Sequence, residues 1–165
     1  MLKYKGRVIR VYKERRCLPN GVCADLDIVK HPGAVLIVPF LEKNKIVLLK
    51  QFRPVINDYL YELPAGTLNA GESPLACAGR EIIEEAGFRA RKLILLGAIF
   101  PVPGYSTEKI YIYKAQGLRK ESAPGDSDEI IERMTVTRQQ VKALFKKGRL
   151  VDAKTIAAFA FCGWL

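Results

Sequence analysis

The chain has 165 residues, of which 49% are hydrophobic and 27% charged, and its formal net charge is +10 at pH 7. The length fits one domain over residues 1–165, and the composition excludes a wholly disordered protein. The excess positive charge fits a solvated basic surface or the attraction of a small anionic substrate. Short basic clusters occur outside any helix-turn-helix or zinc-finger pattern, which argues against a nucleic-acid partner.

Cysteine usage and the N-terminus give an expectation for the compartment. The cysteines, Cys17, Cys23, Cys77 and Cys162, form no C-x-x-C pair, and with one histidine a zinc site is not expected. We therefore predict free thiols in a reducing, cytoplasmic protein. The N-terminus lacks the apolar core of a signal peptide, and the longest apolar run, 34–41, is too short to span a membrane.

Apolar patterning predicts strands in the first half of the chain and helices at its end. Weak alternation over residues 1–30 predicts two or three short strands, with a turn at Asn20-Gly21. Further strands are predicted at 34–41, 46–52, 60–63, 93–100, 110–115 and 129–136. Helices are predicted between Ser73 and Gly87, from Thr137 to Gly148, and over 153–161 after the cap Asp152. The pattern indicates an α+β fold with a mixed sheet.

The helix between Ser73 and Gly87 is the most informative segment. Its predicted core face consists of Leu75, Ala78, Gly79, Ile82, Ile83 and Ala86. Glu81, Glu84 and Glu85 gather on the opposite side, where Arg80 can pair with Glu84 four residues on. Crowded carboxylates repel one another, and a divalent cation such as Mg²⁺ would offset that repulsion. The alternative is a solvated acidic helix face.

The residues around this helix favour the metal site. From Gly66 the chain continues through Glu72, Arg80-Glu81-Ile82 and Glu84-Glu85 to Gly87-Phe88. This spacing resembles the Nudix box at every fixed position. The resemblance implies the Nudix fold, an α/β/α sandwich around a mixed β-sheet. It also implies that Glu81, Glu84, Glu85 and the carbonyl of Ala65 bind Mg²⁺, with Mn²⁺ as a substitute, and that Arg80 orients the glutamates.

Segments outside the box are similar to the ADP-ribose pyrophosphatase subgroup. They are the 101–108 loop with its proline, the 51–54 turn, the 62–66 entry into the box and the 148–155 stretch. The similarity implies cleavage of ADP-ribose, or a related nucleoside diphosphate sugar, to AMP and ribose 5-phosphate. The candidate substrate-binding residues are Arg53, Glu62, Pro103, Gly104, Tyr105 and Glu108. For Arg53, Tyr105 and Glu108 a surface or packing role is the alternative, and His31 is expected to be structural.

Two further expectations come from the subgroup. Its members usually carry a catalytic glutamate in the loop that here contains Ser127, so Glu129 and then Asp126 are our candidates for the base; otherwise a box glutamate serves. Its members are often homodimers, and residues 1–30 could form an N-terminal β extension for dimerisation. Other functions left open are hydrolysis of another nucleoside diphosphate derivative and a nucleotide- or RNA-binding module.

Overall fold

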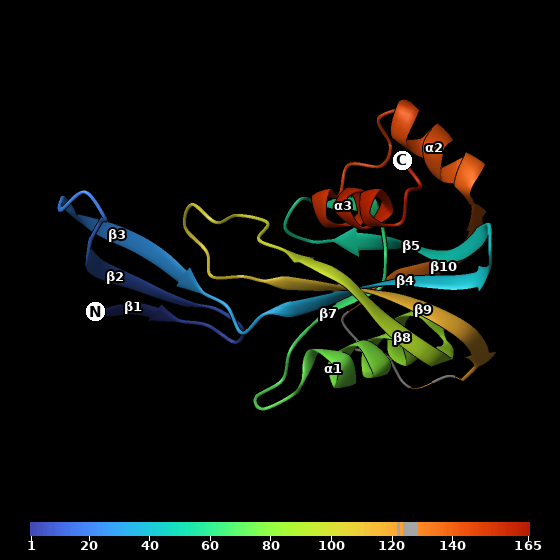
Figure 1. Ribbon diagram of the computed structural model, residues 1–165, viewed down its shortest axis with the longest axis horizontal. Coiled ribbons are helices and arrows are strands. Elements are labelled where there is room, and N and C mark those ends of the chain that lie inside the picture. The colour runs from blue at the N-terminus through green and yellow to red at the C-terminus, as the bar shows by residue number, and fades with distance from the viewer. Residues whose placement is uncertain (122, 124–128) are drawn as a thin grey trace.

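The computed structural model describes residues 1–121, 123 and 129–165, which form a sandwich with a projecting arm (Figure 1). Within these residues the sandwich contains a seven-stranded sheet, with β10, β5, β4, β9 and β8 in that order, β6 beside β5 and β7 beside β4. The strands are β4 (Ala34–Glu42), β5 (Lys45–Arg53), β6 (Asp58–Glu62), β7 (Ala65–Thr67), β8 (Phe88–Ile99), β9 (Ile110–Lys120) and β10 (Ile131–Thr137). The pair β4–β9 is parallel and the other pairs are antiparallel, so the sheet is mixed.

Helices cover both faces of this sheet. Helix α1 (Pro74–Glu81) and its continuation η1 (Ile82–Ala86), a π-helix, lie on one face, while α2 (Arg138–Lys146) and α3 (Ala153–Phe161) lie on the other (Figure 1). The fold is therefore the predicted α/β/α sandwich. No helix in the described part of the chain is long and apolar enough to cross a membrane.

Strand β4 is buried on both faces and separates the two halves of the core. Leu36 and Val38 pack in the cluster that includes Phe159 of α3. Val35 and Ile37 point the other way, into the cluster beneath α1 and η1. This division follows from the alternation of side chains along a strand. It explains why 34–41 reads as a continuous apolar run rather than an alternating one.

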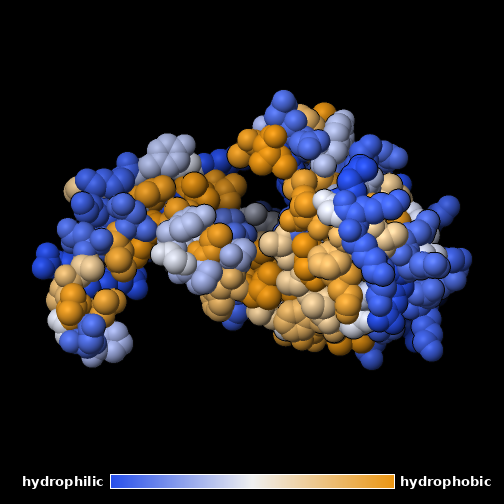
Figure 2. Space-filling model, turned by 90° about the horizontal axis from the view of Figure 1, so that it is seen from above, coloured by the Kyte–Doolittle hydropathy of each residue, from blue (hydrophilic) through white to orange (hydrophobic). Residues whose placement is uncertain are grey.

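The N-terminal residues form a separate antiparallel sheet of β1 (Leu2–Lys5), β2 (Arg10–Cys17) and β3 (Cys23–Lys30). This sheet, which we call the arm, projects from the sandwich (Figure 1) and exposes apolar side chains among hydrophilic ones (Figure 2). The expectation of free thiols was wrong for two cysteines, because Cys17 and Cys23 form a disulfide. They lie directly opposite each other in the β2–β3 register, beside the Asn20-Gly21 turn.

Candidate active site

The helix that carries the clustered glutamates begins as expected and ends differently. Ser73 caps α1 by accepting a hydrogen bond from the Ala76 N–H, and Pro74 occupies the first turn. After Glu81 the backbone widens into the π-helix η1, where the Gly87 N–H reaches the carbonyl of Ile82 as well as that of Ile83. Gly87 then ends it in the left-handed conformation, with φ of 77°. The prediction of a single α-helix up to Gly87 was therefore wrong. Short π-helical turns of this kind recur at functional sites.

A side chain from the sheet stabilises the widened turn. Arg133 of β10 donates to the backbone carbonyl oxygens of Glu84, at 2.8 Å, and Glu85, at 2.5 Å. These contacts satisfy carbonyls at the helix end that would otherwise lack a partner. The predicted core face of the helix is confirmed at Ala78, Ile82 and Ala86, which are buried. Leu75, by contrast, is 53% exposed and lies outside the core.

Arg80 holds three of the acidic side chains. Its Nη1 donates to Glu81 Oε1 at 2.6 Å and to Glu84 Oε2 at 2.9 Å. Its Nε and Nη2 donate to the two oxygens of Glu72, each at 3.0 Å. Hydrogen bonds from Arg80 are the main reason that the pKa of Glu72 falls to about 2. The arrangement suits the orienting role expected for Arg80 and contains the predicted pair with Glu84.

Two of the box glutamates are buried without full compensation of their charge. Glu81 is 8% exposed and Glu85 is 4% exposed. Burial raises the pKa of Glu81 to about 7 and the pKa of Glu85 to about 8. Repulsion from Glu129 adds to both shifts, together with that from Glu84 for Glu81 and from Glu81 for Glu85. Glu85 Oε2 accepts a hydrogen bond from the Ala65 N–H at 2.8 Å, which partly opposes the shift. Such carboxylates are stabilised by a proton or by a cation.

Gly66 allows the helix to approach β7 closely. A Cβ atom at this position would lie 1.8 Å from Glu81 Oε1, far inside van der Waals contact. Any other residue would displace Glu81 from its place beside the strand. The glycine at the start of the box is therefore required by the position of a glutamate near its end.

The glutamates open into one cavity of about 480 Å³. Its lining includes Arg53, Ala65, Gly66, Arg80, Glu81, Glu84, Glu85 and Glu129. No three acidic, histidine or cysteine side chains of the described residues converge closely enough to count as a formed metal site. However, one oxygen each of Glu81, Glu84 and Glu85 accepts no hydrogen bond from the described part of the chain. These oxygens are the hard donors that Mg²⁺ prefers, so the residues fit a divalent cation.

A second cavity, of about 390 Å³, adjoins the first through Arg53, Ala65, Gly66 and Thr67. Arg53 is held there by Glu62, to which it donates two hydrogen bonds at 2.7 and 2.5 Å. Lys154 donates to the same carboxylate at 2.6 Å and to Asp152 at 2.8 Å. Because Glu62 is 1% exposed, it positions these two cations and is poorly placed to touch a ligand.

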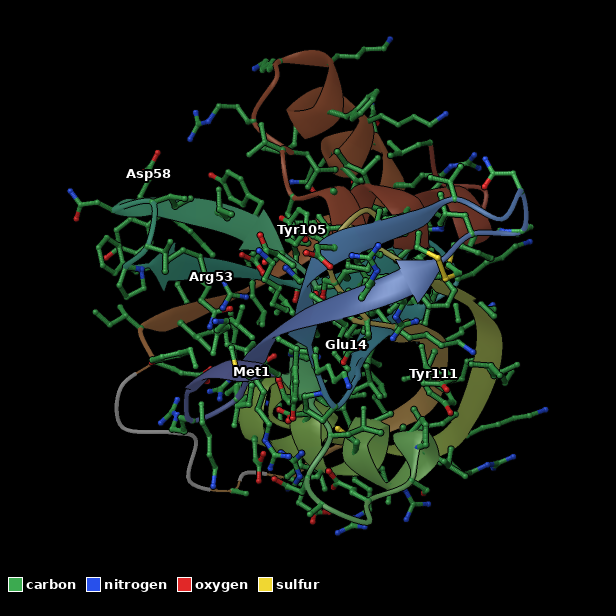
Figure 3. The ribbon with its side chains drawn as sticks, turned by 90° about the vertical axis from the view of Figure 1, so that its left-hand side faces the viewer. Met1, Glu14, Arg53, Asp58, Tyr105 and Tyr111 are labelled. Carbon is green, nitrogen blue, oxygen red and sulfur yellow. A yellow bond between two sulfur atoms is a disulfide. The ribbon has the colours of Figure 1, made fainter. Side chains whose placement is uncertain are left out.

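The other candidate substrate-binding residues differ in whether they line one of these two cavities. Glu108 lines the second cavity. Pro103, Gly104 and Tyr105 line neither, and the Tyr105 carbonyl instead accepts a hydrogen bond from Val29 of the arm. Arg53 ends β5, whereas Tyr105 belongs to the segment between β8 and β9; both are labelled in Figure 3. The substrate-binding role of Pro103, Gly104 and Tyr105 thus stays a prediction.

The structure also locates the candidate base and the lone histidine. Glu129 lines the glutamate cavity just before β10, and Gln51 contacts it at 3.5 Å. Asp126 and Ser127 lie outside the described residues. His31 Nδ1 accepts a hydrogen bond from the Gly33 N–H at 3.1 Å, in keeping with a structural role. Arg7 also lines the glutamate cavity. The sequence did not indicate that Lys154, Arg133 and Arg7 belong to the site, because isolated basic residues carry no motif.

Comparison with known proteins identifies the family. Residues 30–159 match the model of the NUDIX domain, so the chain belongs to the Nudix family and is a Nudix hydrolase. An ADP-ribose pyrophosphatase of Bacillus subtilis (strain 168) is 38% identical over 160 residues, covering 96% of this chain and 86% of the relative. The methanol dehydrogenase activator of Bacillus methanolicus is 36% identical, with the same coverage.

More distant relatives extend the comparison. A GDP-mannose pyrophosphatase of Citrobacter koseri is 31% identical over 147 residues, covering 79% of this chain and 76% of the relative. The crystal structure of an ADP compounds hydrolase superposes with a TM-score of 0.84 at 24% identity, over 98% of this chain and 88% of that one. That structure supports the fold.

Proposed function

We propose that this enzyme hydrolyses ADP-ribose, or a closely related nucleoside diphosphate sugar, to AMP and a sugar phosphate with the help of Mg²⁺ or Mn²⁺. The observation that carries the proposal is the cavity in which Glu81, Glu84 and Glu85 face Arg53. A nucleoside diphosphate sugar carries a pyrophosphate between two bulky groups, which suits adjoining cavities. The similarity to the ADP-ribose pyrophosphatase of Bacillus subtilis supports this choice of substrate.

Glu81, Glu84, Glu85 and the carbonyl of Ala65 would hold the metal. When bound, a divalent cation neutralises charge on the pyrophosphate and lowers the pKa of water. Arg80 keeps Glu81 and Glu84 in place through hydrogen bonds to one oxygen of each. Arg133 keeps the backbone of the following turn in its widened form. These residues position their partners and need not touch substrate.

Arg53 lines both cavities, so the pyrophosphate would pass beside it. A guanidinium can bind phosphate oxygens with two parallel hydrogen bonds. Glu62 fixes the guanidinium and so reduces the entropy lost on binding. Glu129 shares the glutamate cavity and is our first candidate for the base that activates the attacking water, with Asp126 second.

The decisive experiment is a panel of nucleoside diphosphate derivatives incubated with Mg²⁺ and scored by the phosphomonoesters released. We expect ADP-ribose to give the highest kcat/KM and to yield AMP and ribose 5-phosphate. GDP-mannose is the second candidate, because a GDP-mannose pyrophosphatase is among the relatives. Failure to cleave any nucleoside diphosphate sugar in the presence of Mg²⁺ would refute the proposal.

We also propose that the arm mediates a homodimer. It presents Leu2, Tyr4, Leu18, Val22 and Leu26 with at least a third of each exposed. A three-stranded sheet has too little core to bury these side chains by itself, and a second copy would cover them. Light scattering coupled to size exclusion should give twice the 18.5 kDa mass of the chain. Deletion of residues 1–30 should give a monomer, and an unchanged mass would refute the role of the arm.

A further inference from the structure

A third cavity, of about 650 Å³, lies where the arm meets the sandwich. The arm side and the short segment after it contribute Arg7, Arg10, Lys30 and His31 to its lining. The sandwich side contributes Thr67, Leu68, Asn69 and Ala70. No aspartate or glutamate is among the described residues that line it. The cavity is therefore large and one-sided in charge.

The register of the arm concentrates this charge further. Arg10 of β2 lies directly opposite Lys5 of β1 on one side and Lys30 of β3 on the other. Residues directly opposite in a sheet share a face, so three cations form a row across the arm. Like charges in this position destabilise a sheet. A bound anion would remove that cost.

Among the described residues, ion pairs offset one end of the row. Glu14 forms an ion pair with Lys30 at 2.7 Å, and it also pairs with Arg16 at 2.8 Å. Lys30 is further held over the ring of Tyr12, at 4.2 Å from its centroid. No ion pair to a carboxylate of the described residues is formed by Arg10 or Lys5. The centre of the row thus keeps its charge for a ligand.

The third cavity is continuous with the glutamate cavity, because Arg7, Val8, Thr67 and Asn69 line both. In Figure 3 the strands of the arm, with Glu14 labelled, are seen in front of the sandwich. A ligand whose pyrophosphate lies beside the glutamates can therefore extend toward Arg10 and Lys30. An anionic group on that part of the ligand would complement these two cations.

We propose that the third cavity binds an additional phosphomonoester carried on the nucleoside ribose of the substrate. This inference rests on the proposed function and deepens it: the substrates would be nucleoside diphosphate derivatives phosphorylated at the ribose 2′ or 3′ position. A phosphomonoester carries close to two negative charges near neutral pH and several strong acceptor oxygens. Arg10 and Lys30 can meet it from neighbouring strands with charge-assisted hydrogen bonds.

The test compares kcat/KM for ADP-ribose with that for ADP-ribose phosphorylated at the adenosine 2′ or 3′ position. We expect one phosphorylated substrate to be favoured by at least about tenfold, the effect of one charge-assisted contact. Arg10→Gln should reduce this preference to near unity and leave kcat/KM for ADP-ribose unchanged. Arg15→Gln is the matched control, because Arg15 lies on the same strand, points to the opposite face and lines none of the three cavities.

A binding measurement separates this inference from the proposed function. Calorimetry in EDTA should show that adenosine 2′,5′- or 3′,5′-bisphosphate binds at least about tenfold more tightly than AMP, and that Arg10→Gln abolishes the difference. If this holds but no ADP-ribose derivative is cleaved, only the proposed function fails. If ADP-ribose is cleaved and the extra phosphate gives no advantage in binding or turnover, the inference is overturned. If Arg15→Gln lost the preference for the phosphorylated ligand to the same extent as Arg10→Gln, the inference would also be overturned, since net charge would then explain the effect.

Discussion

Replacement of Glu85 by glutamine tests whether burial of the box carboxylates is costly in the metal-free protein. Glu85 is 4% exposed, and burial raises its pKa from 4.5 to about 8. Each pKa unit corresponds to about 1.4 kcal/mol, so ionised Glu85 would cost at most about 5 kcal/mol of stability. Relaxation and water penetration reduce such penalties, and we expect about 1–3 kcal/mol. A glutamine can still accept the hydrogen bond from Ala65.

The direction of the pH dependence follows from the raised pKa. The folded protein holds the proton on Glu85 more tightly than the unfolded chain does. The resulting stabilisation is complete below about pH 4.5 and is lost as the pH rises toward about 8. The wild type in EDTA should therefore lose stability between pH 5.5 and pH 8, and Glu85→Gln should lose less. Glu81, with a pKa of about 7, contributes the slope that remains in the variant.

Urea unfolding in EDTA at both pH values measures the effect. At pH 8 we expect Glu85→Gln to be more stable than the wild type, yet about a hundredfold less active with Mg²⁺, since a charged ligand is lost. Glu121→Gln is the control, because the ion pair of Glu121 with Arg89 lies on the surface. Hydrogen bonds from Arg89 lower the pKa of Glu121, so this carboxyl titrates below the pH window of the experiment. Equal pH slopes for the wild type and Glu85→Gln would refute the argument from burial.

Other predictions address the remaining parts of the site. Activity should vanish in excess EDTA, and millimolar Mg²⁺ should raise the melting temperature of the wild type, since the cation binds only the folded site; full turnover in EDTA would exclude a metal-dependent reaction. Gly66→Ala should displace Glu81 and reduce kcat at least about tenfold, at a stability cost of about 1–3 kcal/mol for overpacking; unchanged kcat would show that the close approach is dispensable. Glu129→Ala should lower kcat at least about tenfold, or about 1.4 kcal/mol of barrier, at saturating Mg²⁺. A normal rate there, and in Asp126→Ala, would leave a box glutamate as the base.

The elements with regular patterns were predictable from the sequence. Helix α3 occupies the predicted residues 153–161, and β4 and β5 extend the predicted ranges by one residue at most at each end. Caps at Ser73, Thr137 and Asp152 mark the helix starts, because side-chain oxygens that satisfy the first N–H groups are a local signal. The box motif, with its fixed spacing, likewise predicted which glutamates would share a cavity.

Features that depend on contacts between distant segments could not be predicted. The π-turn after Glu81 has no sequence pattern of its own and is held by Arg133, which belongs to a strand far along the chain. The short strand β7 forms only because it pairs with β4. Lys154 enters the site through Glu62, and their separation of 92 residues hides the pair from any local analysis. Prediction of the Cys17–Cys23 disulfide would have required the register of the β2–β3 hairpin, which places the two cysteines opposite each other.

The parallel pairing of β4 with β9 has a consequence for how the enzyme acquires its site during synthesis. The register joins Ala34 to Ile110, so the centre of the sheet forms only after most of the chain has left the ribosome. Arg133, which fixes the turn that carries Glu84 and Glu85, is made later still. Such distant contacts make folding slow relative to locally connected folds. Because the turn that carries Glu84 and Glu85 is fixed only once Arg133 is present, the metal cannot nucleate folding as it does in a zinc finger, and we expect nascent chains to be indifferent to it.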